Sequence, residues 1–262
     1  MIIAAALCPS PPLLMPGLTG AASVLPELRR ACEQAVTELV AADPDVVAVV
    51  GPGEQTMIWD AAARLDLAAF APGIGVAVLP MGDALPTGGH LRAPDGTEPT
   101  AVHPGSGLPV SLGIGAWLLD QAGHAGELLL QSVASRESAE RCARLGADLA
   151  TAAIRTGLLV LADGSACRNP KAPGYFDERS AGFDAEVERT VRAGDLGALL
   201  DIDAELAGDL MATGRPAWQV LAGALTGERL TTEIRYCDDP FGVAYLVASL
   251  RVEPLTAPPA KG

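Results

Sequence analysis

Five residues with reactive side chains follow short apolar runs in this sequence. They carry a hydroxyl, carboxyl or thiol group: Ser10, Glu54, Asp163, Ser165 and Cys167. Carboxyl groups can transfer protons or bind metals, and a thiol becomes a nucleophile when its pKa is lowered. Histidine, the usual base near neutral pH and a frequent metal ligand, is missing from all three loops that hold these residues. These residues are therefore candidates for a polar pocket, and none of them is assigned as a metal ligand or catalytic group.

The alternation of apolar runs and amphipathic stretches predicts the elements that position these loops. Short apolar runs bounded by Gly, Pro or Asp are typical of buried strands. They occur at Ile2–Leu7, Asp45–Val50, Gly75–Leu79, Glu127–Val133, Gly157–Ala162, Thr231–Tyr236 and Val243–Leu250. Helical patterns occur in Ala21–Ala42, in Ser135–Thr156 with Ser135 as the expected cap, and over most of Ser180–Leu225. We expect an α/β fold with a central, mostly parallel sheet covered by helices on both faces.

We expect a single domain over residues 1–255 and a flexible C-terminal tail at 256–262. The Gly- and Pro-rich stretch Pro80–Val110 is expected to run over the surface. In sheets of this class, ligands bind in loops beyond the carboxyl ends of the strands, which is where the candidate residues lie. Trp59, Trp117 and Trp218 fall in helix-like stretches and are expected in the core or at an interface.

Composition excludes several classes of function. The chain has 262 residues, of which 49% are hydrophobic, so it is long enough for a sizeable core. A net charge of −14 argues against nucleic acid as a partner. We expect no membrane partner, because no uncharged apolar run reaches the ~18 residues of a membrane span. Five cysteines without a Cys-x-x-Cys pair fit a reducing, cytoplasmic setting.

Motifs for nucleotide binding and for serine hydrolases are incomplete. The segment Gly113-Ile114-Gly115 lacks the third glycine of a dinucleotide fingerprint, and no Walker-type sequence occurs. The segment Gly105-Ser106-Gly107 does not fit a nucleophile elbow. We expect no cofactor.

Several motifs together resemble one known superfamily. They are the turn Pro9–Pro16, the loop Asp163–Asn169 with Gly174–Asp177 and Phe183-Asp184 after it, and the segment Asp239–Val247. In this order they resemble the catalytic subunit of class III extradiol ring-cleavage dioxygenases, a superfamily that also contains the Memo-like proteins. The resemblance extends over nearly the whole chain.

The resemblance implies an Fe(II) site that this chain does not match. Active members hold the iron with two histidines and a carboxylate. The resemblance implies that the position of the family's first iron-binding histidine is Ser10 here, that of the second lies within Gly51–Glu54, and that of the acid/base histidine is at about Cys167. The carboxylate ligand falls in the Glu205–Arg215 region, where Asp209 is a shifted candidate.

Other residues offer alternative sites. His90 and His103 could reach one metal if their loop folded back over the sheet, although we favour two solvated side chains. His124 is expected to cap a helix end. Cys8 and Cys167 could form a thiolate site for a softer metal, but we favour two buried thiols. Cys167 beside Arg168 could also be a reactive thiol.

Two functions follow from the resemblance and its departures. In the one that we favour, the chain is a catalytically degenerate dioxygenase-like protein, a pseudoenzyme without the Fe(II) site, whose vestigial cleft binds a small molecule or contacts a subunit. In the alternative, it is an active oxidoreductase or hydrolase that uses non-standard pocket residues, with or without a replacement metal. The resemblance also implies a homo-oligomer or a helper subunit.

Overall fold

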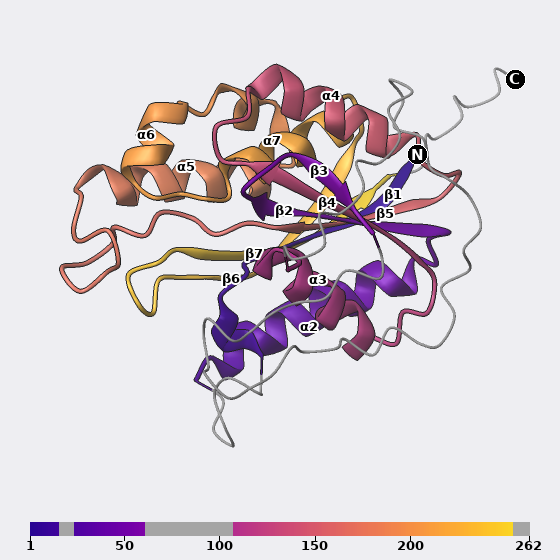
Figure 1. Ribbon diagram of the computed structural model, residues 1–262, viewed down its shortest axis with the longest axis horizontal. Coiled ribbons are helices and arrows are strands. Elements are labelled where there is room, and N and C mark those ends of the chain that lie inside the picture. The colour runs from indigo at the N-terminus through magenta and orange to yellow at the C-terminus, as the bar shows by residue number, and fades with distance from the viewer. Residues whose placement is uncertain (16–23, 61–106, 254–262) are drawn as a thin grey trace, which may run out of the picture.

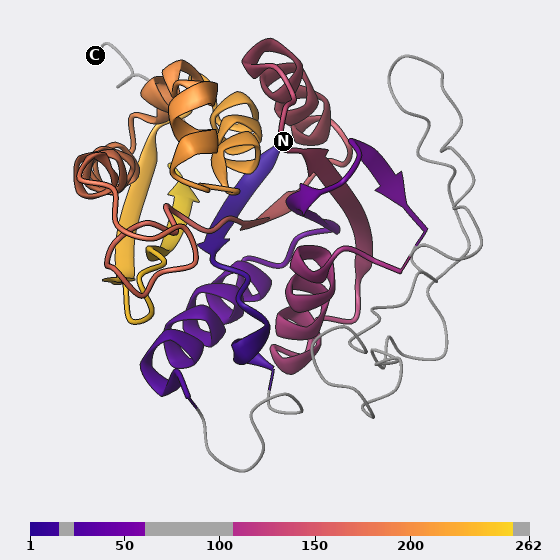
Figure 2. The same ribbon diagram turned by 60° about the vertical axis from the view of Figure 1, so that its left-hand side comes forward.

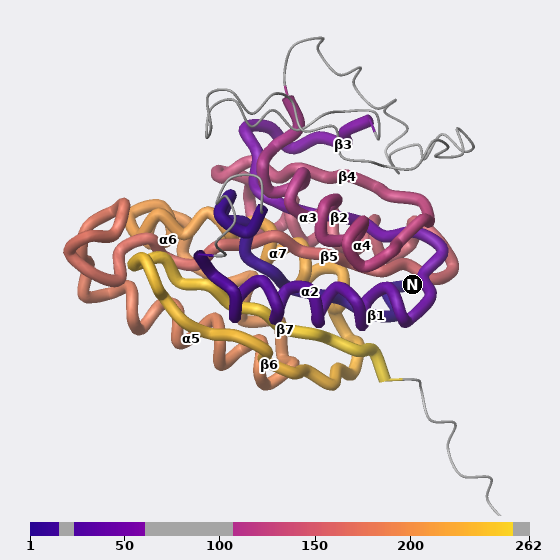
Figure 3. Tube along the Cα trace, turned by 90° about the horizontal axis from the view of Figure 1, so that it is seen from below, coloured from indigo at the N-terminus to yellow at the C-terminus, as the bar shows by residue number. Residues whose placement is uncertain are grey.

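A seven-stranded sheet forms the centre of the computed structural model, which describes residues 1–15, 24–60 and 107–253. The strand order is β3-β4-β2-β5-β1-β7-β6, and Figure 3 shows it from β3 at one edge to β6 at the other. The strands are β1 (Ile2–Cys8), β2 (Val46–Gly53), β3 (Met57–Trp59), β4 (Glu127–Ala134), β5 (Thr156–Leu161), β6 (Leu230–Asp238) and β7 (Tyr245–Val252).

The four inner strands β4, β2, β5 and β1 are parallel, and the outer three join antiparallel. Strand β5 is buried along its whole length, as expected for a strand covered on both faces. Cys8 at the end of β1 pairs with Leu161 at the end of β5, so these carboxyl ends lie together. The antiparallel β6–β7 hairpin brings its turn to the same end of the sheet.

Helices cover both faces of this sheet (Figures 1 and 2). They are η1 (Pro12–Leu14), α2 (Pro26–Ala41), α3 (Val110–Gln121), α4 (Ala139–Ala150), α5 (Arg179–Ala193), η2 (Leu196–Asp201), α6 (Ala204–Asp209) and α7 (Arg215–Ala224). Helices α2 and α3 pack in one apolar cluster with alternate residues of the strands. Helices α4, α5 and α7 pack in the cluster on the other face. None of the described helices has the length and hydrophobicity to span a bilayer.

Strand β6 forms one edge of the sheet and is irregular at its centre. Its register with β7 shifts between Ile234 and Tyr236. Arg235, at this irregularity, donates to Ser249 and forms ion pairs with Glu38 and Glu233. The edge strand is therefore bulged and charged, as edge strands of native proteins commonly are.

The predicted fold class is confirmed, and the differences lie at the element boundaries. Strand β2 continues to Gly53, beyond the expected end at Val50, because β4 pairs with it as far as Ala134. The prediction of Ser135 as a helix cap is wrong, since residues after β4 first form a turn and Ser138 accepts from Arg141 N at 3.2 Å.

Strand β3 was not predicted, and it contains Trp59, which was expected in a helix. The Trp59 ring is buried and its Nε1 donates to Ser132 Oγ at 2.8 Å, which holds the short strand on β4. The expected strand Gly75–Leu79 and the tail at 256–262 lie outside the described residues. The domain boundary therefore stays a prediction.

Two glycines allow helices α4 and α7 to approach closely. A Cβ atom at Gly146 would lie 2.2 Å from the carbonyl oxygen of Val220, and one at Gly223 would lie 2.3 Å from that of Ala143. Because backbone atoms occupy both positions, no side chain can rotate away to make room. The pair therefore sets how closely α4 packs against α7, the helix that contains Trp218.

Replacement of Gly146 by Ala (G146A) should lower the free energy of unfolding by about 2–3 kcal/mol, because the added methyl group forces α4 and α7 apart. The matched control is Gly182→Ala in α5, where nothing lies within 4 Å of the added atom. G182A should stabilise the protein by up to about 1 kcal/mol through helix propensity. Urea denaturation of both variants tests this, and equal effects of the two would contradict the packing argument.

Candidate functional site

The loop after β5, Asp163–Asn169, joins the turn of the β6–β7 hairpin by backbone hydrogen bonds. Gly164 N donates to Ala244 O at 2.8 Å, and Ala244 N donates to Ser165 O at 2.8 Å. Arg168 N donates to Gly242 O at 3.1 Å, where Gly242 adopts a positive φ of 76°. The loop therefore continues the sheet's hydrogen bonding beyond the strand end and holds its side chains in fixed positions.

Ser10 and Asp163 come together at the carboxyl ends of β1 and β5. Ser10 N donates to Asp163 Oδ1 at 2.7 Å. Burial raises the pKa of the Asp163 carboxyl to about 6, although the Ser10 N–H opposes this by stabilising the charged form. Burial also raises the pKa of the neighbouring Tyr245 hydroxyl, and the Asp163 charge adds to that effect. The pair thus holds one buried carboxyl group that keeps its proton to higher pH than an ordinary aspartate.

Ser165 is fully buried and bound to Asp184 of α5. Both its backbone N and its Oγ donate to the Asp184 carboxylate, at 2.9 and 2.5 Å. Burial raises the pKa of Asp184, and the Ser165 hydrogen bonds and the nearby Arg168 oppose the shift. The Ser165 hydroxyl is therefore a donor that positions a pocket carboxylate.

Cys167 is buried among backbone carbonyls. Its Sγ lies 3.5 Å from the carbonyl oxygens of both Gly174 and Leu210. Burial raises the pKa of the thiol, and the charges of Asp177 and Asp184 raise it further, while Arg179 opposes. A neutral, enclosed thiol is a poor nucleophile, so these surroundings disfavour a reactive Cys167.

The thiolate site of Cys8 and Cys167 is also not formed. Cys8 belongs to the apolar cluster under α2, where it hydrogen-bonds with the buried Cys32. Arg168 donates from Nε to Asp239 Oδ2 at 2.9 Å. Within residues 1–15, 24–60 and 107–253, no group of three or more His, Cys, Asp or Glu side chains is placed to hold a metal ion.

Glu54 lies apart from the other candidates. Its side chain is exposed, beyond the end of β2. The backbone before it is packed closely, because a Cβ atom at Gly51 would lie 2.6 Å from Ser111 Oγ. Ser111 is held there by donating to the carbonyl oxygen of Pro52 at 2.7 Å. A larger residue at position 51 would have to displace this serine.

The remaining candidates have structural roles. Asp209, the shifted carboxylate candidate, is exposed and pairs with Arg179 at 3.2 Å. His124 follows the end of α3, where its backbone N donates to Leu119 O at 2.9 Å and Gly123 has a φ of 74°, as in a Schellman cap. Burial lowers the pKa of the His124 ring. His90 and His103 lie outside the described residues.

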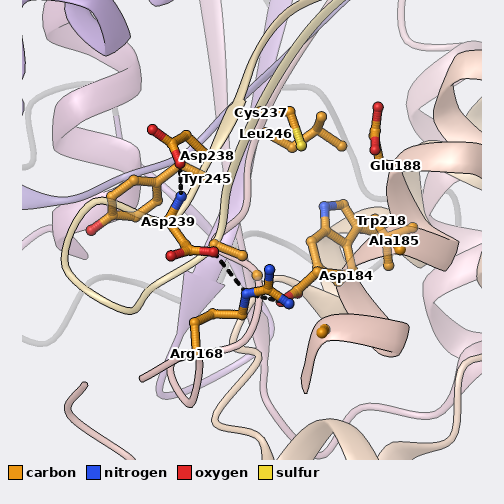
Figure 4. A pocket seen from close by; sticks show the side chains of 14 residues that line it. Arg168, Asp184, Ala185, Glu188, Trp218, Cys237, Asp238, Asp239, Tyr245 and Leu246 are labelled. Atoms are coloured by element: carbon orange, nitrogen blue, oxygen red, sulfur yellow. Dashed lines mark hydrogen bonds and ion pairs between the residues drawn. The ribbon is translucent and has the colours of Figure 1, made fainter. Parts of the chain in front are cut away.

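A pocket of about 240 Å³ lies beside this loop, between α5 and the β6–β7 hairpin (Figure 4). Residues from the loop, α5, α7 and the hairpin line it: Gly164, Arg168, Ala181, Asp184, Ala185, Val187, Glu188, Trp218, Cys237, Asp238, Asp239, Ala244, Tyr245 and Leu246. None of the five candidate residues lines it directly. Ser165 and Asp163 flank Gly164 and position the pocket's wall.

Two hydrogen-bond donors at the pocket lack acceptors in the described part of the chain. Arg168 Nη1 is buried without a partner, although Nε of the same side chain is paired with Asp239 and lies 3.8 Å from Asp184. Trp218 is 1% exposed, and its Nε1 also lacks a partner. Both nitrogen atoms are enclosed by protein, and five other buried side-chain atoms of the described residues also lack a hydrogen-bond partner: Arg29 Nε and Nη2, Glu38 Oε2, His124 Nε2 and Thr232 Oγ1.

Sequence reasoning missed most of this pocket. Asp184 and Asp239 stood out only as parts of longer motifs, and Trp218 was expected in the core, where most of its ring does lie. A usable signal was the acidic turn Asp238-Asp239-Pro240-Phe241-Gly242 between two predicted strands. This turn indicates the pocket only when it is known to lie beside the end of β5, which the sequence does not show.

Comparison with known proteins yields a structural neighbour and no family. No family model matches the chain, and no curated protein matches it. Among solved structures, the chain is similar to uncharacterized protein JW3007 from Escherichia coli K12, with a TM-score of 0.53 and 14% identity. The match covers 95% of this chain and 99% of that one. At this identity the likeness supports the fold alone.

Replacement of Asp163 by Asn (D163N) should change how stability depends on pH. Ionisation of Asp163 is disfavoured in the folded chain up to about pH 6, but the ordinary pKa of 3.8 applies after unfolding. The wild type therefore loses stability from this group as the pH rises from about 4 to about 6. The free energy of unfolding of D163N should rise relative to wild type by about 1–3 kcal/mol over that range, measured with urea.

Asp177→Asn serves as the control of opposite sign. Arg179 lowers the pKa of the exposed Asp177 to about 2. The charged Asp177 therefore stabilises the folded protein above pH ~4, and this stabilisation is lost as the pH falls toward ~2. D177N should therefore lose a little stability relative to wild type at neutral pH. A D163N profile parallel to that of the wild type would contradict the burial of a charged Asp163.

The five cysteines should differ sharply in reactivity. Cys237 is exposed, whereas Cys8, Cys32, Cys142 and Cys167 are buried. Titration of the native protein with a thiol-reactive disulfide at about pH 8 should modify one thiol quickly and the other four only in denaturant. The Cys237→Ser variant should lack the fast phase. A fast phase that persists in C237S and maps to Cys167 would show that its surroundings open readily.

Proposed function

We propose that this chain is a catalytically degenerate relative of the class III extradiol dioxygenases that binds a small molecule in the pocket between α5 and the β6–β7 hairpin. The observation that carries the ligand-binding role is the pocket of about 240 Å³ itself, whose wall combines apolar side chains with Arg168, Asp184 and Asp239. Because each water in liquid occupies roughly 30 Å³, a space of this size holds about eight waters and suits a molecule of a similar number of non-hydrogen atoms.

The roles of the residues at the resembled iron-ligand positions support the loss of ring cleavage. Ser10 supplies a hydroxyl group in place of an imidazole, and its backbone is bound to Asp163. Gly51 has no side chain, and Ser111 fills the space beside it. Cys167 is enclosed by carbonyl groups. These positions offer packing and internal hydrogen bonds where a facial triad needs two imidazoles and a carboxylate.

One observation favours the alternative of an enzyme with non-standard residues. Asp163 has its pKa raised to about 6, which is in the range of an effective general acid or base. Its partner in the structure is the backbone N–H of Ser10. A hydrolase or an oxidoreductase built on Asp163 would lose turnover in D163N, whereas the binding role proposed for the pocket would remain.

Binding of small molecules to this pocket should depend on the free space beside α5. Ala185 is exposed at the pocket's rim, so Ala185→Leu adds bulk there without disturbing the core. Compounds of up to about a dozen non-hydrogen atoms from a mixed library, detected by NMR shifts, should bind wild type and lose at least about tenfold in affinity in A185L. Ala193→Leu, at the exposed end of the same helix, should leave binding unchanged.

Two outcomes would contradict the proposal. If no compound binds in a manner sensitive to A185L, the pocket is not a ligand site. If the protein, supplied with Fe(II) and catechols in air, forms ring-opened product above the background of free Fe(II), the chain has kept the dioxygenase reaction and is not degenerate.

A further inference from the structure

Acidic side chains dominate the polar part of the pocket wall. Asp184 and Glu188 come from α5, Asp238 and Asp239 come from the β6–β7 hairpin, and Arg168 is the one basic residue among the described residues of the lining. The side chains of Asp184, Glu188 and Asp239 are 14%, 28% and 35% exposed, and Asp238 is exposed as well. A molecule in the pocket can therefore reach carboxylates from two of its sides (Figure 4).

Arginine side chains compensate only part of this charge. Arg168 Nε lies 2.9 Å from Asp239 Oδ2 and 3.8 Å from Asp184 Oδ2, so one guanidinium group is shared by two carboxylates. Arg192, one turn along α5, pairs with Glu188. Among the described residues, the four carboxylates thus share two guanidinium groups, and the wall keeps an excess of negative charge.

The Cys237 thiol, which also lines the pocket, is placed within this excess of charge. Burial raises the pKa of the thiol, the charges of Glu188, Asp184 and Asp238 raise it further, and Arg192 opposes them. Carboxylates from two elements therefore act on a single sulfur atom of the wall, and Figure 4 shows Glu188 on one side of it and Asp238 on the other. A potential that resists a thiolate attracts a cation to the same place.

The wall disfavours an anionic ligand. Arg168 is the residue with which a ligand's carboxylate or phosphate would pair, but its guanidinium group already lies against Asp239 and Asp184. An anion at Arg168 would meet both acids at short range, and this repulsion opposes binding.

The rest of the wall suits an apolar body. Ala181, Ala185, Val187 and Leu246 provide aliphatic surface. Because a charged group is costly to bury away from water and counter charge, an ammonium group would lie toward the carboxylates, with its hydrocarbon part against the aliphatic side chains. Small organic amines combine these two parts.

We propose that this pocket binds small organic cations, amines with an apolar body, in preference to uncharged or anionic molecules of the same shape. The inference rests on the proposed ligand-binding function and adds the class of ligand. The space of about 240 Å³ limits such an amine to about eight non-hydrogen atoms. Because the carboxylates are partly exposed, the attraction weakens as the salt concentration rises.

Three probes with the same ring test the class: benzylamine, benzyl alcohol and benzoate. At low salt, benzylamine should bind at least about fivefold more tightly than benzyl alcohol, and benzoate should bind most weakly. The preference for benzylamine should shrink at about 0.5 M salt, because exposed charges are then screened. NMR shifts measure all three affinities.

Glu188→Gln removes one carboxylate and keeps the shape of the side chain. E188Q should lower the affinity for benzylamine about threefold or more and leave that for benzyl alcohol unchanged. Glu186→Gln is the matched control, since Glu186 is exposed on the same helix, pairs with Arg189 and lies outside the pocket lining. E186Q should keep both affinities as in the wild type.

Cys237 gives a second measurement that needs no bound ligand. Two methanethiosulfonate reagents of similar size are compared, one with a trimethylammonium group and one with a sulfonate group. Relative to their rates with 2-mercaptoethanol, the cationic reagent should modify Cys237 at least about fivefold faster than the anionic one. E188Q should reduce this ratio, E186Q should retain it, and C237S should lack the reaction.

The outcomes separate the two proposals. Tighter binding of benzyl alcohol or benzoate, sensitive to A185L, would overturn the cation class and support the ligand-binding function. Library compounds that bind without a preference for cations would overturn the class, and so would a Cys237 that shows no preference for the cationic reagent. Failure of every compound to respond to A185L would overturn both proposals.

Discussion

The hydrogen bonds between the β5 loop and the β6–β7 turn are the constraint on which the rest of the candidate site depends. Gly164, Ser165 and Arg168 are all paired through backbone atoms with the hairpin turn. This places the loop's side chains against α5 on one side and the hairpin's acids on the other. Arg168 can meet Asp184 and Asp239 together only because two segments about 70 residues apart are joined in this register.

The same arrangement explains why polar loop residues need not form a catalytic centre. Ser165 is hydrogen-bonded to Asp184, Cys167 to carbonyl groups, and the backbone N–H of Ser10 to Asp163. Each hydrogen bond holds a loop in place against the end of the sheet, and buried polar groups require such partners. The pocket lies beside this loop, and Arg168, Asp184 and Asp239 form part of its wall.

The fold could be predicted from the sequence because its inner strands are continuous apolar runs and its helices are amphipathic. The short strand β3 could not, since three residues held by a tryptophan hydrogen bond to β4 carry no periodic signal. The β1 and β5 loops were found because Ser10 and Asp163 directly follow strands. The pocket was not found, because its residues come from a loop, two helices and a hairpin turn that only the tertiary register brings together. Moreover, Trp218 is a core residue in every respect except its indole nitrogen, and no pattern in the sequence separates a satisfied indole from an unsatisfied one.

The irregular β6 strand limits how copies of this protein could associate. The register of β6 shifts at Arg235, whose side chain is bound to Ser249, Glu38 and Glu233, so the strand does not present a regular row of backbone groups. A foreign strand added along β6 would meet this shifted register. Self-association, where it occurs, would then use a helical face or loops, and a continuous intermolecular sheet is disfavoured along β6.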